Sequence, residues 1–515
     1  MQFRILIPAL TLCLISANLA NSEPIEISLQ NAIEAALENN LGLRIAAYAP
    51  ANAADSIEIE EARFDSTLFG STSLSESAAA AASSSLDSAA VPENETRRAQ
   101  AGIEKRLGTG GTVTVDSSIR RSASNNNAAR NPDYGTDVGL SISQPLLQGA
   151  GFKVNLAPLA RAKVNADRSL FELRSDILDL VLQTEIAYWD LSYARADRAL
   201  IASSLALAEN LLEENTERER LGLVTPLEVL QAEAEVLNQQ EAILNADRAI
   251  QDAEDALRRA MGQVDFSQVL TDQLAVAQLP DTLAPLRPMD RVVVDTIRSD
   301  VDAKAQERRI ELERINRILA EDATRPRLDL AAGVNYLGRD QDGRVAYRGA
   351  YAADGYDWNV GLEVRLPWGF REARARARQA ARNVSQAELE LYDIKQAKAL
   401  AARNAWRSAD TGLKRIEVTR AALRLNEEAF EQERARFGSG LVAYRGVLEA
   451  QRDFDRARSN YLRSVIETLR ATVRLSRVDG TLLTRNSLDW DTVTPYTQVT
   501  PSPVDLSTTE STTTP

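Results

Sequence analysis

The chain contains no histidine, and its 515 residues include a single cysteine, Cys13. Without histidine, the commonest general base and metal ligand are missing. Cys13 falls in segment 1–22, where a basic residue, an apolar run and small residues follow one another as in a secretory signal peptide. If this segment is cleaved, the mature chain has no thiol for a disulfide or a thiolate metal site. We therefore expect an exported protein that is not an enzyme and has no metal or cofactor.

Long apolar runs are also missing. After the signal segment, no stretch reaches the roughly 18 apolar residues of a transmembrane helix. An exported chain of this kind is expected to be periplasmic, secreted or inserted in a membrane as β-strands. The formal net charge is −14, which disfavours nucleic-acid binding. The glycine-rich stretches 108–111 and 149–153 lack the Gly-Lys-Ser/Thr ending of a phosphate-binding loop.

What the chain does contain is very long helical patterning. Segment 156–220 has no glycine and no proline after Pro158, and as one helix it would span roughly 100 Å. The next segment repeats apolar residues every seven positions, along two adjacent seams: Val229, Val236, Ile243, Ile250 and Leu257, and Leu230, Leu237 and Leu244. Such a repeat is typical of helices wound around other helices. The pattern predicts a long helical hairpin in which each helix has more than one neighbour.

A second hairpin, 369–480, repeats the first. A shift of 218 residues aligns the tip Gly222-Leu223 with Gly440-Leu441, and Gly262 with Gly480. We interpret this as an internal duplication. The predicted organisation is a signal peptide (1–22), a first repeat (23–262), a linker (263–288), a second repeat (289–480) and a C-terminal segment (481–515) with a disordered Ser/Thr/Pro-rich tail.

Each repeat also contains strand-like segments. In the first, a helix over 29–63 with a break at Pro50 leads to alternating strands. In the second, a helix over 291–323 also leads to alternating strands. The predicted strands are 67–71, 99–107, 112–120 and 137–144 in the first repeat, and 328–337 and 357–366 in the second. Segment 263–288 reads as irregular and segment 338–355 as a loop. So few strands cannot close a membrane barrel in one chain, so other subunits must complete it.

Several stretches carry a family resemblance: Leu29-Gln-Asn-Ala-Ile-Glu-Ala-Ala-Leu-Glu-Asn-Asn40, Ser143-Gln-Pro-Leu146, and the tips 220–226 and 437–442. With the duplicated architecture, the chain resembles the TolC-like outer-membrane efflux proteins. The resemblance implies a mainly α fold with membrane β-strands, in which long coiled-coil hairpins form a periplasmic α-barrel continuous with a shared, trimeric outer-membrane β-barrel.

The resemblance also implies a function and partners. Such proteins are passive exit ducts of tripartite efflux pumps or type I secretion systems, held in outer-membrane lipid and joined by a periplasmic adaptor to an inner-membrane transporter. One departure concerns the strands. The family core has two per repeat, whereas the first repeat here has an additional hairpin around Gly108–Gly111, whose role the sequence leaves open.

The resemblance places candidate sites near the tips. Gly222, Leu223, Gly440 and Leu441 are expected to contact the adaptor, although glycine could simply permit the chain reversal. Gate candidates are the acids Glu228 and Glu449, with Phe437, Tyr444 and Arg445 as a latch. An ordinary solvated helix face explains Glu228, Glu449 and Arg445 equally well.

A basic run, Arg371, Arg374, Arg376, Arg378 and Arg382, begins the second long helix. It could face lipid head groups or anionic cargo, or pair with carboxylates on a neighbouring helix. A different class of function, a periplasmic coiled-coil adaptor or scaffold, also fits long hairpins. That alternative predicts a β-rich lipoyl-like domain on one hairpin, whereas this chain has two hairpins and strands that end at proline.

Overall fold

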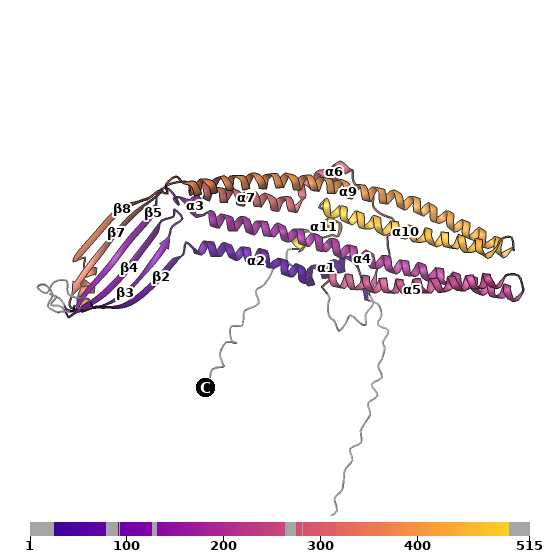
Figure 1. The fold of residues 1–515 in the computed structure, drawn as a ribbon, viewed down its shortest axis with the longest axis horizontal. Helices are drawn as coiled ribbons and strands as arrows, with labels where there is room; N and C mark the ends of the chain where they lie inside the picture. Colours follow the sequence, from indigo (N-terminus) through magenta and orange to yellow (C-terminus); the bar gives the residue numbers. More distant parts are fainter. Residues whose placement is uncertain are drawn as a thin grey trace, which may run out of the picture.

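The computed structural model describes residues 25–78, 91, 93–125, 131–262, 274–280 and 282–493. Figure 1 shows an elongated molecule with a sheet at one end and helices running away from it to two tips at the other end. The predicted signal peptide and the tail from Pro495 lie outside the described residues.

Four helices form the two predicted hairpins. They are α4 (Ala157–Arg220) with α5 (Pro226–Ala260), and α9 (Arg371–Gly438) with α10 (Tyr444–Val478). With 64 and 68 residues, α4 and α9 are each about 100 Å long. The return helices α5 and α10 both have 35 residues. The helical prediction is confirmed, and the equal lengths of the return helices match the inferred duplication.

The first predicted helix breaks at Asn40 and not at Pro50, so that prediction was wrong. It forms α1 (Leu29–Asn39) and α2 (Leu41–Ala62), with Pro50 inside α2. The Asn40 side chain accepts a hydrogen bond from Leu43 N at 3.1 Å and donates one to Ala260 O at 2.9 Å. A side-chain cap held by a distant helix end therefore sets the break.

The second repeat breaks its helix in the same way. The segment predicted as one helix over 291–323 forms α6 (Met289–Ser299) and α7 (Val301–Asp322). Asp300 accepts a hydrogen bond from Ala303 N at 2.8 Å, as Asn40 does for its own following helix. The two breaks are therefore structural counterparts, although the residues differ.

The main sheet has six antiparallel strands in chain order. They are β2 (Ser66–Ala78), β3 (Glu93–Arg106), β4 (Thr112–Ser124), β5 (Asp133–Pro145), β7 (Arg327–Asp340) and β8 (Gly355–Arg365). The six predicted strands are confirmed, and most of them are longer than predicted. The predicted loop 338–355 instead holds a short helix, α8 (Gly343–Tyr351), which packs on β5 and β7. Gly338 permits this contact, because a Cβ there would lie 1.8 Å from Ala346 O.

The segment predicted as an irregular linker contains a strand. β6 (Leu274–Val276) pairs in parallel with β1 (Ile25–Ile27). The buried Tyr188 of α4 holds this pair, because its hydroxyl donates to Ile27 O and accepts from Ala277 N at 2.8 Å. Three-residue strands give no periodicity, so only the tertiary contact with α4 reveals them.

The main core lies midway along the helices. The short α3 (Phe152–Asn155) precedes α4, and α11 (Leu482–Arg485) and α12 (Trp490–Val493) follow α10. Ile33, Leu37, Leu173, Ile177, Val181 and Leu482 are among the buried residues of this core. Leu173, Ile177 and Val181 of α4 are thus internal, whereas the second predicted seam of α5 is exposed, with Leu230, Leu237 and Leu244 each at least 60% accessible.

Candidate functional site

The two tips have the same backbone geometry. Gly222 and Gly440 have φ of +72° and +73°, a conformation that glycine adopts without strain. In each tip, the amide after the glycine donates to a carbonyl five residues back: Leu223 N to Arg218 O and Leu441 N to Arg436 O, both at 2.9 Å. These are Schellman-type helix ends. They leave Leu223 and Leu441 70% and 72% exposed, so both tips present an apolar side chain to solvent.

The tips differ in how the return helix begins. In the first, Thr225 N donates to the Glu228 carboxylate at 2.9 Å, and Pro226 opens the helix. Glu228 is thus engaged in a capping box. In the second, Tyr444 opens the helix after Ala443, whose side chain makes no cap.

The other gate candidates form two separate groups. Glu449 accepts a hydrogen bond from Arg445 at 3.0 Å on the same helix, and both side chains are largely exposed. Phe437 and Tyr444 are buried, with ring centres 5.9 Å apart. Burial raises the pKa of Tyr444 to about 12, so this hydroxyl stays neutral. The charged pair faces solvent and the aromatic pair faces protein.

Arg218, which the sequence patterns did not single out, joins the two hairpins at the aromatic pair. It donates to Phe437 O at 3.1 Å, and its guanidinium lies 4.2 Å from the centre of the Phe437 ring. Its place in the charged run 217–220 gives no signal, because charged residues at a helix end are usually solvated. Only the packing of α4 against the second hairpin assigns Arg218 a cation–π contact.

Ion pairs continue between the hairpins above the tips. Arg452 of α10 pairs with the buried Glu235 of α5 at 2.8 Å. Farther from the tips, α10 pairs with α4 through Arg470–Asp190 at 2.6 Å and Arg477–Asp179 at 2.7 Å. Burial raises the pKa of Asp190, although Arg470 opposes the shift. These pairs fix the register of the two hairpins relative to each other.

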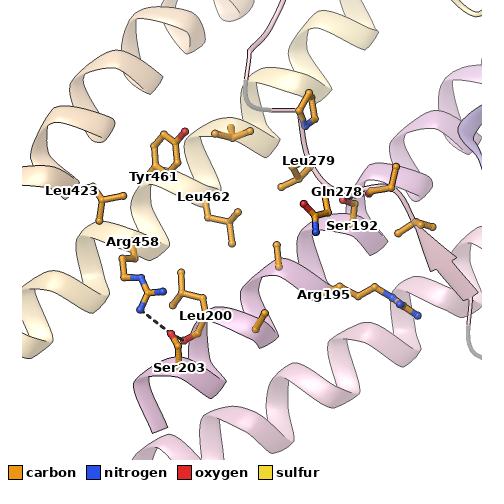
Figure 2. A pocket seen from close by; sticks show the side chains of 16 residues that line it. Ser192, Arg195, Leu200, Ser203, Gln278, Leu279, Leu423, Arg458, Tyr461 and Leu462 are labelled. Atoms are coloured by element: carbon orange, nitrogen blue, oxygen red, sulfur yellow. Dashed lines mark hydrogen bonds between the residues drawn. The ribbon is translucent and has the colours of Figure 1, made fainter. Parts of the chain in front are cut away.

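A cavity of about 650 Å³ opens where α4, α10 and the segment after β6 meet. Figure 2 shows Arg458 of α10 bonded to Ser203 of α4 at its edge, with Leu200 beside Ser203 and Leu462 on the helix of Arg458. Arg195, also on the lining, pairs with Glu254 of α5 at 2.9 Å. Both charged side chains thus have protein partners, and what remains of the wall is mostly apolar.

The main sheet has one apolar and one polar face. The apolar face exposes large side chains on strands from β2 to β8, among them Leu68, Ile103, Val115, Leu140, Ile142, Trp358, Val360 and Leu362. On the polar face, Gln100 donates to Asp116 at 3.0 Å and Asn335 donates to Asp357 at 2.7 Å. Solvent-exposed apolar surface of this extent marks a surface that contacts lipid or protein.

Both sides of the molecule end in unpaired edges. β2 and β8 are the edges of the sheet. In the helical layer, the packing order is α5, α4, α10, α9, so α5 and α9 are its edges. Both edge helices expose apolar side chains: Leu230, Leu237 and Leu244 on α5, and Leu389, Val418 and Leu425 on α9.

The basic run at the start of α9 lies on this exposed edge. Arg376 pairs with Glu372 of its own helix at 2.6 Å, and the five arginines are all exposed. Among the described residues, no group of acidic or thiol side chains could hold a metal ion, and no helix is long and apolar enough to cross a membrane.

The sequence matches the model of one protein family, described as outer membrane efflux protein, over residues 77–263 and 294–481. The two matched segments fall in the two repeats. No protein with a curated description matches the sequence.

Solved structures have the same fold. A membrane protein of Pseudomonas aeruginosa aligns with a TM-score of 0.67 at 19% identity, over 88% of this chain and 91% of that chain. The CmeC outer membrane channel of Campylobacter jejuni gives 0.66 at 16% identity, over 90% of each chain. The outer membrane protein VceC of Vibrio cholerae gives 0.64 at 17% identity, over 88% of this chain and 96% of that chain.

Proposed function

We infer the working form of this chain from one premise: the chain belongs to the outer membrane efflux protein family. It is an outer-membrane efflux channel, the exit component of a tripartite pump, and not an enzyme. Its helical hairpins form a tunnel in the periplasm. The finer proposals concern how copies assemble, what the tips bind and where the tunnel closes.

The working form is a closed ring of copies, and the two exposed edges are the observation that carries this proposal. β2, α2 and α5 lie on one side of the molecule, and β8 and α9 on the other. An unpaired sheet edge has no place in lipid. If β8 of one copy pairs with β2 of the next, the exposed leucines of α5 meet those of α9. Such a head-to-tail contact closes when the rotation between copies is a whole fraction of a turn.

The ring has three copies, as the family resemblance implies. The apolar face of the sheet then faces outer-membrane lipid, with Trp358, Trp368 and Phe152 exposed for the membrane interface. The polar face lines the lumen. The helices continue from the strands and enclose the periplasmic tunnel.

The test changes the exposed seam of α5. Leu237→Gln and Leu244→Gln together should leave the hairpin folded, because both side chains are exposed within one chain. The double variant should lose the assembled mass in detergent, measured by light scattering, while keeping its helical circular dichroism. Asn238→Gln, an exposed polar position on the same helix but to one side of this seam, is the matched control. A wild-type protein that stays monomeric and never enters bilayers would instead support a periplasmic scaffold.

The tips are the docking surface for the periplasmic adaptor. Leu223 and Leu441 support this proposal, because a turn alone needs only the glycine, whereas an exposed leucine follows it in both repeats. Six such leucines in a trimer would offer an apolar rim to helical hairpins of the partner.

Glu449 is the gate acid of the tunnel. Three copies would place three carboxylates in a ring, each partly neutralised by its own Arg445. Phe437, Tyr444 and Arg218 form the latch, since they hold the second tip against the first hairpin. Glu228 caps its own helix and contributes less.

Single-channel recording in planar bilayers tests the gate. Glu449→Ala should lower the preference for cations, measured as a reversal-potential shift in a salt gradient. Gln231→Ala, at the corresponding position of the first repeat, should leave that potential unchanged. Equal potentials for Glu449→Ala and wild type would remove Glu449 from the gate.

A further inference from the structure

The two repeats contribute unequal numbers of strands. In the second repeat, α7 leads into β7 and β8 leads into α9. In the first, α2 leads into β2 and β5 leads into α4, but β3 and β4 lie between them. β2 and β5 are therefore the counterparts of β7 and β8, and the β3–β4 hairpin is an insertion.

The inserted strands are full members of the sheet. β3 and β4 have 14 and 13 residues, longer than the 9–11 residues a tilted strand needs to cross the hydrocarbon layer. β3 pairs along its length with β2 on one side and β4 on the other. A hairpin that only decorated the extracellular end would not keep this register.

The turn of the inserted hairpin is fixed to the helical end of the sheet. Gly151 N donates to Thr109 O at 2.9 Å, and Thr109 Oγ1 donates to Gln144 at 2.9 Å. Gly110 has φ of +95°, and a Cβ there would lie 2.4 Å from Gly149 O. The turn thus packs against the junction of β5 and α3, where a wall strand must end.

Both faces of the sheet continue across the insertion. Ile103 and Val115 pair across β3 and β4 on the apolar face and are about half exposed. Asp116, on the polar face, lies in one cross-strand row with Gly139, Asn335 and Asp357. The insertion therefore has a lipid-facing side and a lumen-facing side, as the other strands do.

Two added strands also preserve the way in which copies can join. With six antiparallel strands in chain order, β2 and β8 run in opposite directions, so β8 of one copy can pair antiparallel with β2 of the next. A single added strand would have made that pairing parallel. The insertion can therefore enlarge the ring without changing its closure.

We propose that the β3–β4 hairpin widens the exit through the outer membrane and raises the size of cargo that can leave. This rests on the proposed ring of three copies. Three six-stranded sheets close eighteen strands, where two strands per repeat would close twelve. For strands about 4.8 Å apart and tilted about 40°, the backbone radius rises from about 12 Å to about 18 Å. The cross-section roughly doubles.

The size of the lumen can be probed from outside the cell, where the periplasmic gate does not limit access. Ser141→Cys places a thiol on the polar face of β5, and Ile142→Cys places one on the apolar face. The only natural cysteine is Cys13, in the predicted signal peptide. Ser141→Cys should react with maleimide polymers of graded mass up to a sharp cut-off, whereas Ile142→Cys, shielded by lipid, should not.

The comparison variant lacks the insertion. Residues 79–132, which include β3 and β4, are replaced by an Asn-Gly turn, so that β2 pairs directly with β5. The hydrodynamic radius of the largest polymer that labels Ser141→Cys should fall at least 1.5-fold in this variant. Equal cut-offs in a trimeric variant and a trimeric wild type would overturn the proposal.

Two controls separate the possible failures. A wild-type protein that is not trimeric in detergent refutes the ring itself, and with it the proposed assembly. If the shortened variant does not fold, electron microscopy of the wild-type trimer along its axis decides. Eighteen strands around the lumen support the proposal, and twelve, with the hairpin folded away from the wall, overturn it.

Discussion

The tips of the two repeats have the same backbone geometry, but their return helices have different neighbours. The shared geometry is what the turn requires, and the different neighbours reflect how the two hairpins pack. Gly222 and Gly440 have the same φ within one degree, and both are followed by an exposed leucine. The return helices, however, are buried to different extents. α10 packs against both α9 and α4, whereas α5 packs mainly against α4 and leaves one seam exposed. Duplication preserved the hairpin, and the position of each hairpin within the chain's own helical layer decided which faces are covered.

The strands show a second difference between the repeats. Four strands of the main sheet come from the first repeat and two from the second, yet the helices that flank them correspond one to one. Strands can be added to the sheet in pairs without disturbing the helices. A pair of antiparallel strands brings the chain back to the end of the sheet where the pair began, so the next helix still starts at the helical end. This makes the sheet the more variable part of the architecture.

The largest effect that would sharpen the comparison concerns the glycines that end the return helices. Gly262 and Gly480 both have positive φ, but a Cβ at Gly262 would lie 2.3 Å from the backbone oxygen of Asn39, whereas at Gly480 it would meet the side chain of Ser299. Backbone cannot move as a side chain can. We expect Gly262→Ala to destabilise by about 3 kcal/mol and Gly480→Ala by about 1–2 kcal/mol.

The midpoint of thermal unfolding, followed by circular dichroism in detergent, measures this order. Gly222→Ala and Gly440→Ala are the controls, since a Cβ there meets nothing within 4 Å. Each should cost about 1 kcal/mol for the left-handed backbone alone. A Gly262→Ala variant as stable as Gly222→Ala would contradict the packing of α5 on Asn39.

The second effect compares two acids that occupy equivalent positions of the return helices. Glu235 is buried and pairs with Arg452 of the other hairpin, whereas Asp453 is exposed and pairs with Arg456 of its own helix. Glu235→Ala should destabilise by about 2 kcal/mol, because it removes an ion pair between hairpins whose acid is buried and whose arginine is about half exposed. Asp453→Ala should change stability by less than about 0.5 kcal/mol. Equal unfolding midpoints for the two variants would contradict a larger contribution to stability from Glu235 than from Asp453.

The third effect concerns the tips. Leu223→Asp and Leu441→Asp should leave the unfolding midpoint unchanged, since both side chains are exposed. Each should weaken adaptor binding about tenfold, or about 1.4 kcal/mol, by placing a charge in an apolar contact. Binding of the purified adaptor, measured by surface plasmon resonance, checks this, and unequal losses would show that the two tips are not equivalent. Leu223→Met is the conservative control.

The smallest effect is a dependence on pH. Burial raises the pKa of Asp455, which accepts a hydrogen bond from Ser204 of α4 and is also influenced by Arg458 and Glu235. A raised pKa means that the packed state favours the protonated acid. The contact between α10 and α4 is therefore strongest below the ordinary aspartate pKa of about 3.9, and it weakens as pH rises through the raised value.

Unfolding midpoints recorded at several pH values should accordingly rise on acidification, and Asp455→Asn should flatten this rise. The exposed Asp453→Asn is the control and should keep the wild-type dependence. An Asp455→Asn protein with an unchanged pH dependence would assign the effect to other buried acids, such as Asp190.

Much of this architecture followed from the sequence alone. The seven-residue apolar repeat predicted the helical hairpins, because that spacing keeps one face of a helix toward a neighbour. Alternation fixed the strands, because successive side chains point to opposite faces. The repeated Gly-Leu-Val fixed the two tips, because glycine alone takes positive φ without strain. The family could be recognised because these local patterns recur in one order.

Only the tertiary structure decided how distant segments meet. The helix breaks at Asn40 and not at Pro50 because Asn40 bonds to the end of α5, a residue 220 positions away. Arg218 contacts Phe437 of the other hairpin, which no periodicity records. The inserted hairpin was visible in the sequence, but its membership in the sheet depends on its register with β2 and β5, and pairing between strands is a property of three dimensions.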